Sequence, residues 1–156
     1  MLSRRQSLAL TTFSEGMNCA QSVCSAFAAD MLADSSAMLR IASCFGGGMR
    51  MGATCGALTG ALMILGLAGG FSVYDPVSKQ NTERLTLDFL AAWKQKVGQT
   101  DCKEILGIDP SLPGQRELAR ERGIFDENCP HCIETAVELL ETILKEHKIT
   151  LGDKDV

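Results

Sequence analysis

The sequence has no excess of positive charge and no export signal. Its formal net charge is −4 and its pI is about 5.2, so neither nucleic acid nor an anionic lipid surface is expected as a partner. The N-terminus carries two arginines and several leucines, but polar residues interrupt them before Glu15 and no cleavage site follows. This pattern favours the first helix of a cytoplasmic protein over a secretory signal.

The chain also lacks a convincing membrane span. Residues 51–74 carry no charge and are long enough to cross a bilayer, but six of them are glycine. The strongly apolar part is confined to residues 61–67, and no basic cluster follows it. We therefore expect a buried central helix here and no stable membrane insertion.

Alternation of period two, which indicates β-strands, is absent, whereas apolar residues recur with helical spacing almost everywhere. One example is the series Leu85, Phe89, Trp93 and Val97, followed by Gly98 as a stop signal. The pattern predicts an all-α fold: a compact bundle of six or seven helices around a glycine-rich central helix. We expect that helix at about residues 53–67, and a single domain over residues 1–156.

Glycines mark two places where backbone could approach a bound group. Gly52, Gly56 and Gly60 lie four residues apart, which would let a neighbouring helix come close and leaves room for a homodimer. The run GGGMRMG at 46–52 lacks the preceding strand and the Lys-Ser/Thr ending of a phosphate loop. It favours a turn whose N–H groups face sulfur or another anion. Gly47, Gly48 and Gly56 are therefore the candidate cofactor-contacting glycines.

Seven cysteines are present, an odd number in a chain without an export signal, which favours reduced thiols over a disulfide framework. Four of them each follow a residue that commonly caps a helix N-terminus. In the first turn of a helix, free N–H groups and the helix dipole stabilise a thiolate. Four such thiolates could converge on one ion or cluster. The four are Cys19, Cys55, Cys102 and Cys129.

The remaining cysteines indicate other roles. Cys24 lies on an apolar helical stripe and Cys44 stands beside Phe45, so packing is expected for both. Cys132 completes the sequence CPHC at 129–132, which we expect at the N-terminus of the last helix, opened by Asn128.

CPHC looks like the active site of DsbA-type disulfide oxidoreductases, with His131 favouring a thiolate at Cys129 and Cys132 resolving mixed disulfides. A thioredoxin-like domain needs a strand before this motif and a βα-rich body after it, whereas only 24 helical-looking residues follow here. His131 and His147 form no catalytic constellation with an acid or serine, and no catalytic residue is assigned beyond this alternative pair.

Four segments of the chain resemble the C_GCAxxG_C_C family, whose redox role has been inferred mainly from its cysteines. They are NCAQSV at 18–23, FGGGMRMGATCGALTGALMILGL at 45–67, DCKEILGID at 101–109 and CPHCIETAVELLETIL at 129–144. The CGAxxG motif appears at residues 55–60. The four cysteines characteristic of the family map onto Cys19, Cys55, Cys102 and Cys129.

The family is also similar to the C-terminal part of split-Soret cytochromes, which implies a non-haem iron–sulfur centre. The haem part of that comparison does not transfer, because the chain has no C-x-x-C-H motif. The leading hypothesis is a small protein that binds an iron–sulfur cluster through the four cysteines, for electron transfer with a redox partner protein or for redox sensing. A thiol–disulfide oxidoreductase and a structural zinc protein are the alternatives, and sequence alone does not choose among them.

Overall fold

The computed structural model describes residues 1–31 and 34–151. Over these residues the chain forms eight α-helices and no strand beyond one isolated β-bridge, which confirms the all-α fold. The helices are α1 (Arg4–Ser14), α2 (Cys19–Met31), α3 (Ser35–Ala42), α4 (Gly56–Gly69), α5 (Pro76–Val97), α6 (Cys102–Leu106), α7 (Gln115–Glu121) and α8 (Ile124–Glu146). Two short helical turns, η1 (Ser43–Phe45) and η2 (Gly48–Gly52), connect α3 to α4.

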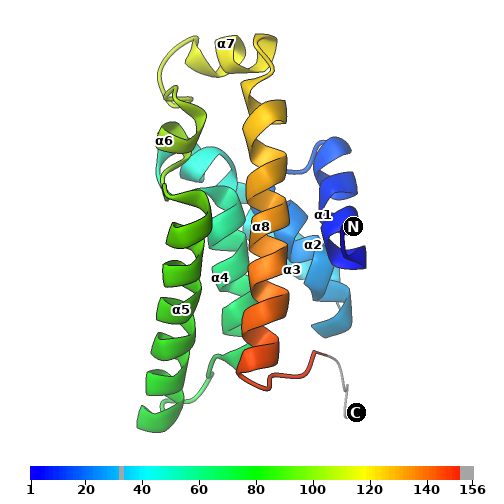
Figure 1. Cartoon of the computed structure of the whole chain (residues 1–156), viewed down its shortest axis with the longest axis vertical. Coiled ribbons are helices and arrows are strands. Elements are labelled where there is room, and N and C mark those ends of the chain that lie inside the picture. Colours follow the sequence, from blue (N-terminus) through cyan, green and yellow to red (C-terminus); the bar gives the residue numbers. More distant parts are fainter. Residues whose placement is uncertain (32–33, 152–156) are drawn as a thin grey trace.

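The glycine-rich helix α4 occupies the central position that the sequence predicts. It packs against α2, α5 and α8 (Figure 1), although it begins at Gly56, three residues later than expected. The short helices α6 and α7 lie together at one end of the bundle, the upper end in Figure 1, where α8 begins. None of the helices described is both long enough and apolar enough to span a bilayer.

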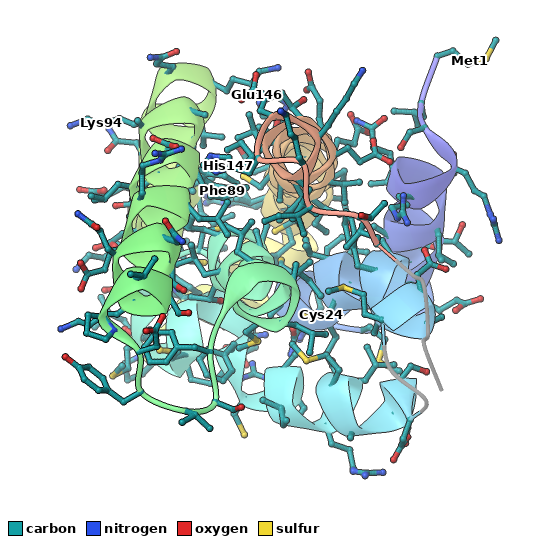
Figure 2. All side chains as sticks on the ribbon, turned by 90° about the horizontal axis from the view of Figure 1, so that it is seen from below. Met1, Cys24, Phe89, Lys94, Glu146 and His147 are labelled. Carbon is teal, nitrogen blue, oxygen red and sulfur yellow. The ribbon has the colours of Figure 1, made fainter. Side chains whose placement is uncertain are left out.

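Large side chains from α2, α5 and α8 fill the core. Phe27, Phe89 and Trp93 are completely buried, and the Trp93 indole N–H donates a 2.9 Å hydrogen bond to the Gln99 carbonyl. Figure 2 shows Phe89 directed from α5 into the bundle, whereas Lys94 on the same helix points outward. The helix ends at Gly98, so the predicted four-residue series and its stop signal are confirmed.

Helices α2 and α4 approach each other closely because Gly60 has no side chain. A Cβ atom built on Gly60 would lie 2.7 Å from the Ala20 carbonyl oxygen and 2.9 Å from the Ala20 Cα. At the same contact, the Gly60 carbonyl accepts a 3.6 Å hydrogen bond from the buried Cys24 thiol. Cys24 is thus a core residue, as predicted.

The last helix starts earlier than the sequence suggested. We expected Asn128 to cap it, but α8 begins at Ile124 after Gly123, which adopts a left-handed conformation (φ 69°). The Asn128 side chain donates instead to the Ile124 carbonyl at 2.8 Å, within the helix. Asp126 and Glu127 fall in the first turn, where the helix dipole favours carboxylates. At the other end, His147 pairs with Asp88 at 2.9 Å.

Candidate functional site: a cavity lined by five cysteines

Five cysteines line one cavity of about 290 Å³, referred to below as the cysteine cavity. Four are the predicted ligands and the fifth is Cys132, from the same helix as Cys129. They come from the starts of α2, α4 and α6 and from the first half of α8: Cys19, Cys55, Cys102, Cys129 and Cys132. Cysteines more than a hundred positions apart in the sequence therefore line the same cavity.

Cys55 and Cys102 are held together by the isolated β-bridge between residues 54 and 101. The Cys55 amide donates to the Thr100 carbonyl at 2.8 Å, and the Cys102 amide donates to the Ala53 carbonyl at 2.7 Å. Each cysteine then begins a helix, because Cys55 is the N-cap of α4 and Cys102 is the first residue of α6. Thr54, the residue before Cys55 that was expected to cap this helix, takes part in the bridge instead, and the cap lies one residue later.

Cys19 is positioned by a capping box at the start of α2. The Asn18 side chain accepts from the Gln21 amide at 3.0 Å, and the Gln21 side chain accepts from the Asn18 amide at 3.1 Å. The Asn18 amide group also donates to the Ser43 carbonyl at 2.9 Å, which ties α2 to the turn η1. Across the helix contact, a Cβ on Gly56 would lie 3.1 Å from the Cys19 Cβ, so glycine lets α4 approach this cysteine.

Cys129 and Cys132 lie three residues apart inside α8, so both thiols face the cavity. The prediction that Cys129 stands in the first turn of a helix is wrong, because α8 begins five residues earlier. His131, between them, is exposed and does not line the cavity. Each CPHC thiol interacts with a cysteine from another helix, Cys129 with Cys19 and Cys132 with Cys55.

The thiols differ in their tendency to ionise. The pKa of Cys55 is lowered by a hydrogen bond from Cys132 and by the backbone N–H groups of Ala57 and Leu58 at the start of α4, although burial opposes this. The pKa of Cys132 is raised well above its ordinary value, first by its hydrogen bond to Cys55 and then by burial. Burial raises the pKa of Cys102 to about 12, and the pKa of Cys19 is raised by its hydrogen bond to Cys129 and by burial.

Thiols dominate the donor set of the cavity, and the one side-chain oxygen among its described lining residues, that of Asn18, already accepts from the Gln21 amide. No carboxylate or imidazole is among its lining residues, and its walls include Phe13 and Phe125. Thiolates without oxygen or nitrogen ligands select soft metals and iron–sulfur clusters. Within the described residues, no three His, Cys, Asp or Glu side chains converge closely enough to hold a single metal ion.

A family model described as "Putative redox-active protein (C_GCAxxG_C_C)" matches residues 17–143. The chain belongs to the C_GCAxxG_C_C family. This confirms the resemblance seen in the sequence and, at the level of that description, the redox role. No curated protein and no solved structure matches the chain.

The segment that matches the C_GCAxxG_C_C model includes all five cysteines of the cavity and the glycine run before α4. Gly47 and Gly56 line the cavity, whereas Gly48 does not: it is buried behind the lining, where a side chain would collide with the Ala53 backbone. Cys44 is exposed in η1, so its predicted packing role is wrong. The helix before it ends at Ala42, which turns Cys44 outward.

Sequence reasoning missed three arginines that line the cavity: Arg50, Arg116 and Arg120. The Arg116 guanidinium lies over the Phe125 ring, 5.5 Å from its centroid, and is half-buried. The spacing of four residues between Arg116 and Arg120 on α7 signals a shared helix face, but the sequence gives no sign of what that face meets.

Proposed function

We propose that this protein is a redox protein that binds an iron–sulfur cluster through Cys19, Cys55, Cys102 and Cys129, for electron transfer or redox sensing. The observation that carries the proposal is that these four cysteines line one cavity, whose described lining residues include no carboxylate and no imidazole. Membership of a family described as redox-active supports the same reading.

A cluster fits this donor set better than a single zinc ion does. Zinc in a structural site is held by four ligands about 2.3 Å from one point. No three metal-binding side chains among those described converge in that way, whereas the cavity of about 290 Å³ leaves room for a larger group between the sulfurs. The helix starts at Cys19, Cys55 and Cys102 would direct N–H groups toward a negatively charged group. Structural zinc is therefore the weaker candidate.

The cluster would supply a one-electron couple, and the chain would supply its ligands and surroundings. Cys132 lies outside the proposed ligand set and would remain a neighbouring thiol within hydrogen-bonding reach of Cys55. Apolar walls such as Phe13 would limit access of water to the cavity. An electron-donor or electron-acceptor protein is expected as its partner.

The test is a measurement of iron, zinc and acid-labile sulfide, with an absorption spectrum, on protein purified without oxygen. We expect iron and sulfide in the native protein, their loss in Cys55→Ser, and their retention in Cys24→Ala, whose thiol is buried away from the cavity. A Cys55→Ser protein that keeps a full complement of iron and sulfide would rule the proposal out. Stoichiometric zinc without sulfide would support the structural zinc site instead.

One observation favours a second candidate, a thiol–disulfide oxidoreductase. Cys55 has a lowered pKa and lies beside Cys132, whose raised pKa keeps it protonated. A thiolate next to a thiol is the arrangement in which the first attacks a substrate disulfide and the second then resolves the mixed disulfide. For a thiol–disulfide oxidoreductase, Cys55 and Cys132 are therefore a more favourable pair than Cys129 and Cys132. Metal-free protein that fails reconstitution and forms a Cys55–Cys132 disulfide would support it.

A further inference from the structure

Three guanidinium groups, those of Arg50, Arg116 and Arg120, line the cysteine cavity, although they come from two separate segments. Arg50 belongs to the turn η2, and the other two belong to α7. Among the described residues, none of the three forms an ion pair or a side-chain hydrogen bond with a carboxylate; Glu117, next to Arg116 in the chain, is exposed and makes no such contact. Their charges are thus not neutralised within this part of the protein.

The arginines are held close enough to affect one another. The pKa of Arg116 is lowered by burial and then by the charges of Arg50 and Arg120. The Arg116 side chain crosses Gly47 so closely that a Cβ there would lie 2.9 Å from its Nη1 atom. Stacking on Phe125 fixes its other side. Repulsion among these guanidinium groups would be relieved by a negative group bound between them.

The backbone conformation at Arg50 also indicates a functional site at this cavity. Four consecutive residues, 47–50, have left-handed backbone conformations, and two of them, Met49 (φ 56°) and Arg50 (φ 62°), are not glycine. Such a conformation is unfavourable for a residue with a side chain and is concentrated at functional sites. Arg50 combines this conformation with a place in the cavity lining.

The segment that forms this end of the bundle carries no excess of positive charge. Residues 101–128, which form α6, α7 and the start of α8, contain seven acidic and four basic side chains. A docking face for an acidic protein would need a broader excess of basic residues. The arrangement therefore fits a small anion better than a macromolecule.

We propose that Arg50, Arg116 and Arg120 form a binding site for a small oxyanion, such as a carboxylate, sulfate or phosphate group of a small molecule, at the cysteine cavity. Arginine suits this role because its planar fork binds two oxygens of one oxyanion. The site goes beyond the proposed cluster and does not require it, since the arginines belong to the chain itself. An anionic small molecule bound there would lie next to the cysteines of the proposed redox centre.

The experiment is a titration of the protein with sodium sulfate, sodium phosphate and sodium citrate at constant ionic strength, with chloride as the reference anion. Binding is followed by calorimetry and by NMR shifts of backbone amides in residues 47–50 and 115–121. Metal-free reduced protein and protein carrying whatever metal it retains are both measured. We expect saturable binding of at least one oxyanion in both states, so the result is readable even where the cluster hypothesis fails.

Arg116→Gln and Arg120→Gln are each expected to weaken binding by about tenfold, because each removes a charge-assisted hydrogen bond. Arg122→Gln is the matched control: it makes the same change of charge one residue beyond α7, at a position that does not line the cavity. The Arg116→Gln variant loses the contact with Phe125, and that loss alone can disturb its packing. Arg120 is exposed, so Arg120→Gln should fold normally and keeps the proposal testable.

Three results would overturn the proposal. The first is the absence of saturable binding in either state. The second is an equal loss of affinity in Arg122→Gln and Arg120→Gln, which would indicate non-specific charge attraction. The third is binding in the metal-free state alone, which would show that the arginines serve a bound metal group and not a separate oxyanion.

Discussion

Cys55 and Cys102 are joined by a reciprocal pair of backbone hydrogen bonds across the bridge between residues 53–55 and 100–102. Forty-six residues, including the whole of α5, lie between the two cysteines in the sequence. The bridge holds the backbones of two cysteines that line the cavity next to each other. Backbone hydrogen bonds, and not the cysteine side chains, hold this part of the cavity wall in place. Cysteine variants should therefore keep the same backbone and can be compared with one another.

The first prediction concerns the close contact between α2 and α4. Gly60→Ala would place a methyl group 2.7 Å from the Ala20 carbonyl oxygen, so the helices must separate. Overpacking of this kind costs about 1–3 kcal/mol of the free energy of unfolding. Urea denaturation of metal-free protein measures it.

The matched control for Gly60→Ala is Gly66→Ala in the same helix, where nothing lies within 4 Å of the new Cβ. Alanine is the better helix former, so this variant should gain about 0.5–1 kcal/mol. Equal effects of the two substitutions would contradict the role assigned to the α2–α4 contact.

The second prediction concerns the cap of α2. Asn18→Ala removes the capping bond to Gln21 and the bond to the Ser43 carbonyl, and should cost about 1–2 kcal/mol of the free energy of unfolding. It should also lower iron incorporation, because Cys19 follows directly. Asp75→Ala removes the cap of α5, far from the cavity in sequence, and should reduce stability while leaving the metal content unchanged. A matching loss of metal in both variants would mean that general instability, not the position of Cys19, is responsible.

The third prediction concerns the ligand set. Cys132→Ala should retain iron and sulfide at the native ratio, whereas Cys129→Ser should lose them, because the proposed ligand in α8 is Cys129. Both residues are buried in the same helix and line the same cavity, so the two variants are closely matched. Metal analysis and the absorption spectrum read the result. The reverse outcome would assign the ligand to Cys132.

The fourth prediction is a pH dependence of stability that arises from Cys24. Burial raises the pKa of this thiol from its ordinary value of 9.0 to about 12. The folded state then keeps the proton that the unfolded state loses, so the contribution of Cys24 to stability is complete below pH 9 and declines as the pH rises toward 12. The slope is at most about 1.4 kcal/mol per pH unit for one thiol. Urea midpoints between pH 8 and pH 10.5 should fall less steeply in Cys24→Ala, and an unchanged slope would refute the assignment.

Local patterns in the sequence predicted most of the fold. The apolar series of α5, its stop at Gly98 and the capping box at Asn18 are short-range features, and all three are found. The predicted start of α8 is wrong because Asn128 is a good capping residue in the sequence. The helix is preceded instead by Gly123, whose left-handed backbone conformation cannot be recognised from the sequence. Where two nearby residues could both precede a helix, tertiary packing decides which of them does so.

The cavity was predicted only in part, for a related reason. Four of its cysteines stood out through their predecessors, yet the bridge that joins Cys55 to Cys102 is a long-range contact with no local signature. Arg116 and Arg120 could be placed on one helix face from their spacing, but their meeting with Arg50 depends on the strained turn before α4. Local patterns indicate which groups are available, whereas long-range packing decides which of them meet.

The fifth prediction separates stability from function at Arg50. Its left-handed backbone (φ 62°) suits glycine, so Arg50→Gly should raise the free energy of unfolding by up to about 1 kcal/mol through relief of strain. The same change removes one guanidinium from the proposed oxyanion site and should weaken anion binding by about tenfold. Arg50→Gln keeps the strain and loses the charge, so it should weaken binding without a gain in stability. Urea denaturation and anion titration of the two variants test both effects; a more stable Arg50→Gly protein that binds the oxyanion as well as the native chain would show that the strained turn serves some purpose other than placing this arginine.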